Sequence, residues 1–126
     1  MFLNCSSLTT IPELPATELA PHCYESMFSG CTTLNDVYNL QSYELPATEL
    51  RSYCYKEMFK DCTHLTRINA FLLPATTLAK ECYSDMFNGC SYLNAVPNLP
   101  ATTLAVGCYA RMFKHTEIHS MELPAV

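Results

Sequence analysis

The sequence predicts an α/β repeat solenoid, with short helices along one side of a stack and short parallel strands along the other. Three observations support this fold class. The dipeptide Met-Phe occurs five times, a Leu-Pro-Ala core occurs five times, and Cys-Tyr occurs four times between them in a constant order. A unit of this length cannot bury its apolar side alone, so neighbouring units must stack around one continuous core.

The repeats divide the 126 residues into four near-complete units and one partial unit. Successive Met-Phe pairs begin at residues 1, 27, 58, 86 and 112, which gives steps of 26, 31, 28 and 26 residues by subtraction. The units therefore span about 1–26, 27–57, 58–85 and 86–111, with a partial unit at 112–126. Together they form one domain, 1–126, which we expect to be a fragment of a longer array.

Each unit is predicted to hold a short helix that ends near its Met-Phe pair. Leu19, Cys23 and Met27 lie four residues apart, so on a helix they form one apolar stripe over about two turns. Thr17 is suited to cap the start of this helix. Gly30 follows the helix and tolerates the positive φ with which helices commonly end.

A short strand and a turn are predicted after the second cysteine of each unit. Apolar residues return at every third position in the segments 8–14 and 93–99. The positions between them, which include Asp36 and Arg67, differ from unit to unit while the apolar positions repeat. This pattern is typical of a scaffold that varies the surface it presents.

The combined pattern LPATxLxxxCYxxMFxGCxxLxxxP covers essentially the whole chain, and it resembles the BspA-like, or Treponema pallidum-type, class of bacterial leucine-rich repeats. The resemblance implies a right-handed leucine-rich-repeat solenoid. It also implies a surface-exposed or secreted segment of an adhesive bacterial protein, used for contact with other proteins and not for catalysis.

We expect a non-enzymatic protein-binding module, part of a bacterial surface or secreted adhesin or attachment protein. The alternatives are a purely structural spacer that presents another domain, and a component of a larger assembly such as a virion. The expected partner is a protein on a host or neighbouring cell, and the ends of the stack are expected to meet further repeats or a partner. A cell-surface or secreted location is implied by the resemblance alone. The first ten residues lack the features of a signal peptide.

Candidate contact residues lie where the second and third units are longer than the others. The extra residues fall around 38–43 and 69–72, and they include Tyr38, Tyr43 and Phe71. Aromatic and arginine side chains are the usual anchors of protein interfaces. The predicted partner-binding residues are therefore Asp36, Tyr38, Tyr43, Arg67 and Phe71. The alternative is that these aromatic residues only pack over the edge of the stack.

The eight cysteines form two series, one beside the repeated tyrosine and one after the glycine position of each unit. Cys23 and Cys31 lie eight residues apart (31 − 23), which is about 12 Å along a helix and too far for a disulfide. The Cys-x2-4-Cys spacing typical of zinc knuckles is absent from the sequence. We therefore expect buried free thiols that pack as small apolar side chains.

The sequence predicts no catalytic residue, no cofactor site and no metal site. His115, Glu117 and His119 would share one side of an extended segment, but they lie in a degenerate unit. The sequence contains no phosphate-binding glycine loop and no GxSxG motif. The net charge of −5 provides no basic field for nucleic acid, and no apolar run approaches the roughly 20 residues that span a bilayer.

Overall fold

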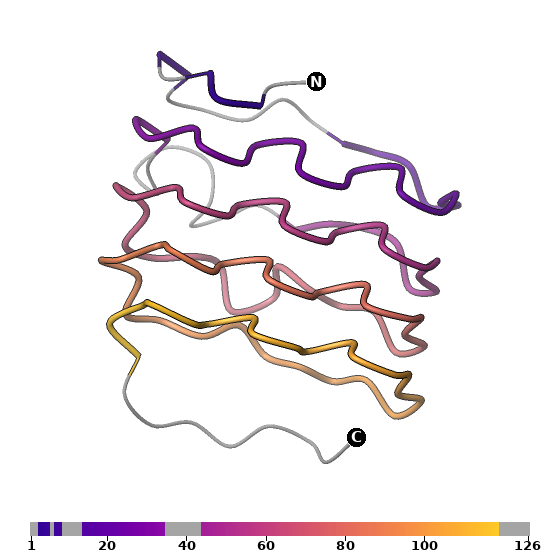
Figure 1. Cartoon of the computed structure of the whole chain (residues 1–126). Coiled ribbons are helices and arrows are strands. Elements are labelled where there is room, and N and C mark those ends of the chain that lie inside the picture. The colour runs from indigo at the N-terminus through magenta and orange to yellow at the C-terminus, as the bar shows by residue number, and fades with distance from the viewer. Residues whose placement is uncertain (1–2, 6, 9–13, 35–43, 119–126) are drawn as a thin grey trace.

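The chain runs in successive layers that stack on one another (Figure 1). The computed structural model describes residues 3–5, 7–8, 14–34 and 44–118. Each of four layers contributes a ten-residue segment to the front of the stack, while the segments that connect them pass behind (Figure 1). We call the front segments turn rows one to four, and they span 21–30, 52–61, 80–89 and 106–115.

The predicted α/β solenoid is wrong, because the described residues contain neither a helix nor a strand. The described part of the chain therefore lacks the secondary structure of a leucine-rich-repeat solenoid. Its β pairing within those residues is limited to two isolated parallel bridges, Glu49–Thr77 and Thr77–Thr103. These bridges lie at the threonine positions where the helices were expected to begin. There the Thr48 and Thr76 carbonyls accept hydrogen bonds from the backbone N–H groups of the following layer, such as that of Thr77.

Each turn row is a series of tight turns with a period of four residues. In row two, Tyr53, Glu57 and Asp61 have φ values of 62°, 56° and 59°. A right-handed helix requires negative φ throughout, so a left-handed residue at every fourth position excludes it. Gly30 has the predicted positive φ, 75°, but it continues this period and does not end a helix. The corresponding left-handed residues of the other rows are His22 and Ser26, Glu81, Asp85 and Gly89, and Gly107, Arg111 and His115.

The backbone N–H groups of a row alternate between two kinds of acceptor. Every second N–H donates within the row, to the carbonyl three residues before it, as Met58 does to Tyr55 at 3.2 Å. The N–H groups between them donate to the next row, as Phe59 does to Met86 at 2.9 Å. Five bonds of 2.8–3.0 Å join each pair of neighbouring rows in this way. The backbone polar groups between rows are thus paired in a continuous network.

The four-residue period also sorts the side chains of each row. Pairs of residues point into the core and alternate with pairs that point outward. Cys54, Tyr55 and Phe59 are at most 1% exposed, whereas Lys56 and Glu57 are partly exposed. The apolar stripe predicted from the sequence therefore faces the core, although the backbone that carries it is not helical.

Aromatic rings form two columns through the stack. The phenylalanine column has ring centroids 5.6 Å apart and comprises Phe28, Phe59, Phe87 and Phe113. The tyrosine column has centroids 5.9–6.1 Å apart and comprises Tyr24, Tyr55, Tyr83 and Tyr109. Neighbouring rings are nearly parallel, with interplanar angles of 2–17°. Stacked pairs of this kind add about 0.5–1.5 kcal/mol each to the stabilisation from burial.

We predict that glycine substitutions distinguish a turn row from a helix. Glu57 has φ of 56°, so Glu57→Gly should leave the free energy of unfolding unchanged or raise it by up to about 1 kcal/mol. Its neighbour Lys56, which has no positive φ and is also partly exposed, provides the matched control. Lys56→Gly should lower the stability by about 0.5–1 kcal/mol. In a helix both substitutions would destabilise by about 1 kcal/mol, so equal losses in urea unfolding would refute the turn geometry.

Candidate functional site

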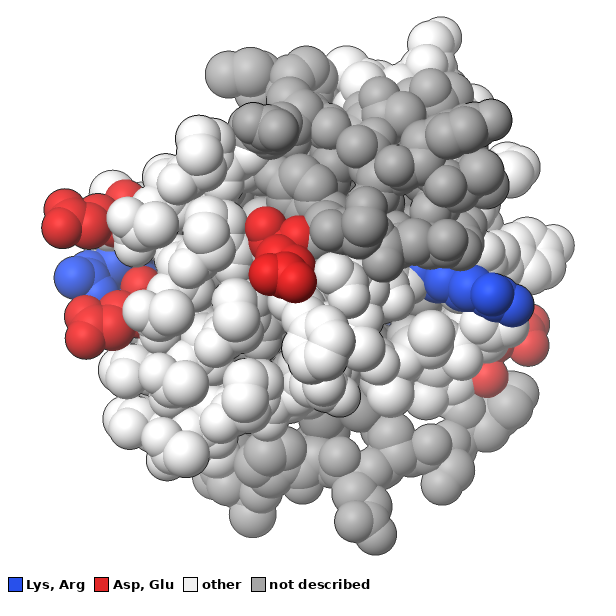
Figure 2. Space-filling model, turned by 180° about the vertical axis from the view of Figure 1, so that it is seen from behind, with Lys and Arg blue, Asp and Glu red and all other residues white. Residues whose placement is uncertain are grey.

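Two segments on the rear side of the stack carry little charge. Figure 2 shows this face, where charged side chains lie at both lateral edges, one acidic patch lies near the middle, and uncharged described surface lies among them. The sequence accounts for the uncharged part, because no Asp, Glu, Lys or Arg occurs between Asp85 and Arg111. The segment 93–99 lies within that interval, and the preceding segment 65–73 contains a single charged residue, Arg67. An uncharged surface loses little hydration energy when a protein partner covers it.

The two rear segments, 65–73 and 93–99, are joined by backbone hydrogen bonds. Asn94 N–H donates to the Thr66 carbonyl at 3.2 Å, and Asn98 N–H donates to the Ala70 carbonyl at 2.8 Å. This pairing holds the side chains of two consecutive layers next to each other. Two layers therefore contribute to one rear surface.

A tight turn at residues 69–72 presents Phe71. Leu72 N–H donates to the Asn69 carbonyl at 3.0 Å, and Phe71 N–H donates to the Asn69 side-chain oxygen Oδ1 at 3.1 Å. Leu72 is fully buried and anchors the turn, whereas Phe71 is 62% exposed. An aromatic side chain held on a fixed turn and left open to solvent is suited to contact a partner.

The structure describes two of the five predicted binding residues. Arg67 and Phe71 are both exposed on segment 65–73, and Arg67 forms no ion pair with any residue in the described ranges. Asp36, Tyr38 and Tyr43 lie outside the described residues. All five assignments stay predictions.

Two exposed apolar residues were missed by the sequence reasoning. Tyr92 is 60% exposed and Val96 is 40% exposed, and both belong to the layer that pairs with segment 65–73. A sequence signal for Tyr92 existed, because the equivalent position before the repeated leucine is occupied by Thr33 and His64 in the two preceding units. We define the rear surface as Arg67, Phe71, Tyr92 and Val96.

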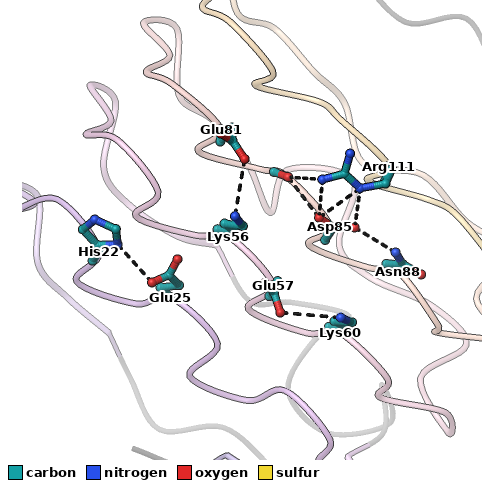
Figure 3. A network of polar contacts seen from close by, with 10 residues as sticks. His22, Glu25, Lys56, Glu57, Lys60, Glu81, Asp85, Asn88 and Arg111 are labelled. Carbon is teal, nitrogen blue, oxygen red and sulfur yellow. Dashed lines mark hydrogen bonds and ion pairs between the residues drawn. The ribbon is translucent and has the colours of Figure 1, made fainter.

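The front of the stack has the opposite character, with charged residues linked in a network (Figure 3). Lys56 Nζ lies 3.4 Å from Glu81 Oε1 and so joins rows two and three. His22 Nδ1 lies 3.0 Å from Glu25 Oε2, and its ring stacks on Tyr53 of the next row at 4.7 Å. Many charged side chains on this side thus pair with one another, which makes the front less suited to bind a new partner.

Asp85 lies at the centre of the most complete part of this network. Arg111 Nε and Nη2 approach the two carboxylate oxygens at 3.0 Å, and Asn88 Nδ2 donates to Oδ1 at 2.8 Å. Ser84 Oγ also donates to Oδ2, at 3.1 Å. Burial by itself would raise the pKa of the Asp85 carboxyl, but the hydrogen bonds from Arg111, Asn88 and Ser84 outweigh it and lower that pKa.

We predict that the Asp85 carboxylate stabilises rows three and four in a pH-dependent manner. Asp85→Asn should lower the free energy of unfolding by about 2 kcal/mol at pH 7, because it removes a charge that accepts several hydrogen bonds. The folded-state pKa is lowered, so this stabilisation is present above the unfolded pKa of about 3.9 and is lost as the pH falls through the folded value. The difference between the two proteins in urea unfolding should therefore shrink below about pH 4. A difference that stays constant with pH would assign the loss to packing.

The cysteines are free thiols, and six of the eight are buried. Cys62 Sγ donates to the Phe28 carbonyl at 3.2 Å, and Cys90 Sγ donates to the Phe59 carbonyl at 3.0 Å, so both link neighbouring layers. The predicted buried thiols are confirmed for these six, but Cys23 is exposed and Cys5 is only partly buried. Both exceptions lie in the first described layers.

Burial sets the reactivity of the inner thiols. Loss of solvation raises the pKa of Cys54, Cys82 and Cys90 to about 12, and it raises the pKa of Cys62 further. Only the thiolate is nucleophilic, so these groups are almost entirely in the unreactive form at neutral pH.

We predict two classes of thiol in a native labelling experiment. Cys23 should react first with a maleimide or with Ellman's reagent, followed by Cys5, and the other six should react only as the chain unfolds. Full labelling of eight thiols is expected in denaturant without reductant. Cys23→Ser should remove the fast phase, while Cys54→Ser should leave it unchanged. Fewer than eight thiols after denaturation would instead reveal disulfides.

No cluster of three or more His, Cys, Asp or Glu side chains suited to hold a metal ion occurs within 3–5, 7–8, 14–34 and 44–118. Of the three residues weighed as a metal site, His115 and Glu117 are described and exposed, whereas His119 lies outside the described ranges. In the part of the chain that the structure covers, no helix is long and apolar enough to cross a membrane.

Comparison of the chain with protein-family models, with curated proteins and with solved structures finds no match.

Proposed function

We propose that the chain is a non-enzymatic protein-binding module and that its rear surface contacts the partner. One observation carries the proposal: Phe71 and Tyr92, two exposed aromatic residues, belong to adjacent layers whose paired segments 65–73 and 93–99 contain a single charged residue, Arg67. Aromatic anchors dominate binding energy when the surrounding surface excludes water. Arg67, exposed and without an ion pair to a described residue, adds a charged contact at the same surface.

The arrangement of the stack supports this role. The core and the hydrogen bonds between rows fix the layers, so the rear side chains are held in place before a partner arrives. A preorganised surface loses little conformational entropy on binding, which favours affinity. The difference between the front, where charged side chains pair with one another, and the sparsely charged rear segments 65–73 and 93–99 favours binding on one side.

The wider setting of this module is also a proposal. Together with the resemblance of the repeats to BspA-like proteins, the rear surface supports a part in a cell-surface or secreted adhesin or attachment protein. Its partner would be a protein on a host or neighbouring cell. If the rear surface binds no protein, the chain is instead a purely structural spacer, which presents another domain or forms part of a larger assembly.

We predict that the rear aromatic residues contribute to binding and not to folding. Phe71→Ala and Tyr92→Ala should each weaken the affinity for a captured partner by about 1–2 kcal/mol, because each removes an exposed anchor. Neither change should lower the free energy of unfolding by more than about 0.5 kcal/mol. Calorimetric titration and urea unfolding measure the two effects separately.

Two further variants serve as controls for this experiment. Phe59→Ala removes a fully buried ring of the core column and should lower stability by about 3–5 kcal/mol. Lys60→Ala changes a side chain on the front of the stack and should leave the affinity unchanged. If Phe71→Ala and Tyr92→Ala destabilise as much as Phe59→Ala, the rear aromatic residues are packing residues. If neither changes the affinity, the spacer reading replaces the binding module.

A further inference from the structure

Row three contains the dipeptide Asn88-Gly89, and Asn-Gly occurs nowhere else in the sequence. The six other asparagines are each followed by a residue that carries a side chain. An asparagine can lose its amide without an enzyme when the backbone nitrogen of the following residue attacks its side-chain carbonyl carbon. Glycine favours this attack, because it has no Cβ to obstruct the approach and its backbone is the most adaptable. The equivalent dipeptides of the other rows are Ser29-Gly30, Lys60-Asp61 and Lys114-His115.

The folded chain holds both reacting groups of this dipeptide in hydrogen bonds. Asn88 Nδ2 donates to Asp85 Oδ1 at 2.8 Å, and the same carboxylate is bound by Arg111 of row four (Figure 3). Gly89 N–H donates to the Lys114 carbonyl of row four at 3.0 Å. The Gly89 nitrogen must lose this proton to react, so pairing with row four opposes the reaction. Asn88 and Gly89 are both partly exposed, so water reaches them once row four separates.

We propose that Asn88 is a site of spontaneous deamidation, which becomes reactive when rows three and four separate. The Gly89 nitrogen gives its proton to hydroxide and bonds to the Asn88 Cγ carbon. The Asn88 Nδ2 group takes up a proton and leaves as ammonia, so that a succinimide ring remains. Water then adds to Cγ, which gives aspartate, or to the backbone carbonyl carbon of Asn88, which gives isoaspartate. In both cases an amide and a water molecule become a carboxylate and ammonia.

Either product disturbs the pairing of row three. In isoaspartate the main chain runs through Cβ and Cγ of residue 88, so an additional carbon displaces Gly89 from the Lys114 carbonyl. The former backbone carbonyl of Asn88, which accepts from Asp61 N–H at 2.9 Å, becomes a free carboxylate. Aspartate keeps the backbone intact but replaces the amide donor beside Asp85 with a second carboxylate, and like charges repel. The reaction therefore records, irreversibly, that row four has separated.

The test incubates the full chain in mildly alkaline buffer, folded and in urea, and follows amide loss by peptide mapping with mass spectrometry. In urea, Asn88 should react about tenfold or more faster than Asn94 and Asn98, whose following residues carry side chains. In the folded chain, loss at Asn88 should be slower by about tenfold or more, because row four must first separate. Arg111→Gly removes the guanidinium from Asp85 at a residue with φ of 51°, so it should speed loss in the folded chain and not in urea.

Asn88→Ser is the matched control, because Ser29 precedes Gly30 in row one and this glycine also has a positive φ. It has no amide to lose, so hydrogen exchange at its Gly89 amide should stay slow during incubation, whereas exchange should accelerate in the isoaspartate form of the unsubstituted chain. Equal loss at Asn88 in the folded and unfolded chains would overturn the proposal. So would loss in urea that is no faster than at Asn94. If Arg111→Gly does not fold, the unsubstituted chain still decides the matter.

Discussion

In turn rows one to three the backbone divides its N–H hydrogen bonds about equally between its own turns and the next row, and the rest of the structure depends on this division. A helix satisfies its backbone internally, so neighbouring helices meet only through side chains. Here every second N–H is left for the neighbouring row, and rows approach one another closely enough for the carbonyl of Met86 to accept from Phe59 at 2.9 Å. The repeated aromatic and cysteine positions must then fall into columns, because the backbone bonds set the alignment of each layer on the next.

This alignment separates the two sides of the molecule. Outward side chains of the rows stand one above another, so charges of opposite sign in adjacent layers meet, as Asp85 and Arg111 do. Five backbone hydrogen bonds also join the connecting segments 62–79 and 90–105, but these segments are longer than the rows, so a smaller share of their backbone groups is paired between layers. Residues there, such as Phe71 and Tyr92, differ between units without disturbing the core. The side that holds the stack together and the side proposed to bind a partner are therefore different.

The sequence was sufficient to predict most of the buried positions and the free inner thiols, because burial follows from which residues repeat. It did not lead to the correct backbone. The stripe Leu19, Cys23, Met27 and Cys31 keeps a spacing of four over twelve residues, whereas a helix would rotate such a stripe by about 120° over that distance. That drift was one piece of evidence against a helix. The other was the presence of Asn4, Asp61 and His115 at the glycine position, since these residue types adopt positive φ more readily than most. Strained positions such as Tyr53 and Arg111 could not be predicted, because only the neighbouring row makes their conformation favourable.

The four turn rows have the same length, ten residues, although the distances between them differ. The intervening segments contain 21, 18 and 16 residues, from 52 − 31, 80 − 62 and 106 − 90. A change of length within a row would shift every later N–H away from its acceptor, while a change in a connecting segment leaves the rows aligned. Gene duplication and unequal recombination can therefore add, remove or exchange whole units freely, provided that the exchange points fall behind the stack. Such a chain can acquire new rear loops one unit at a time while its front is preserved.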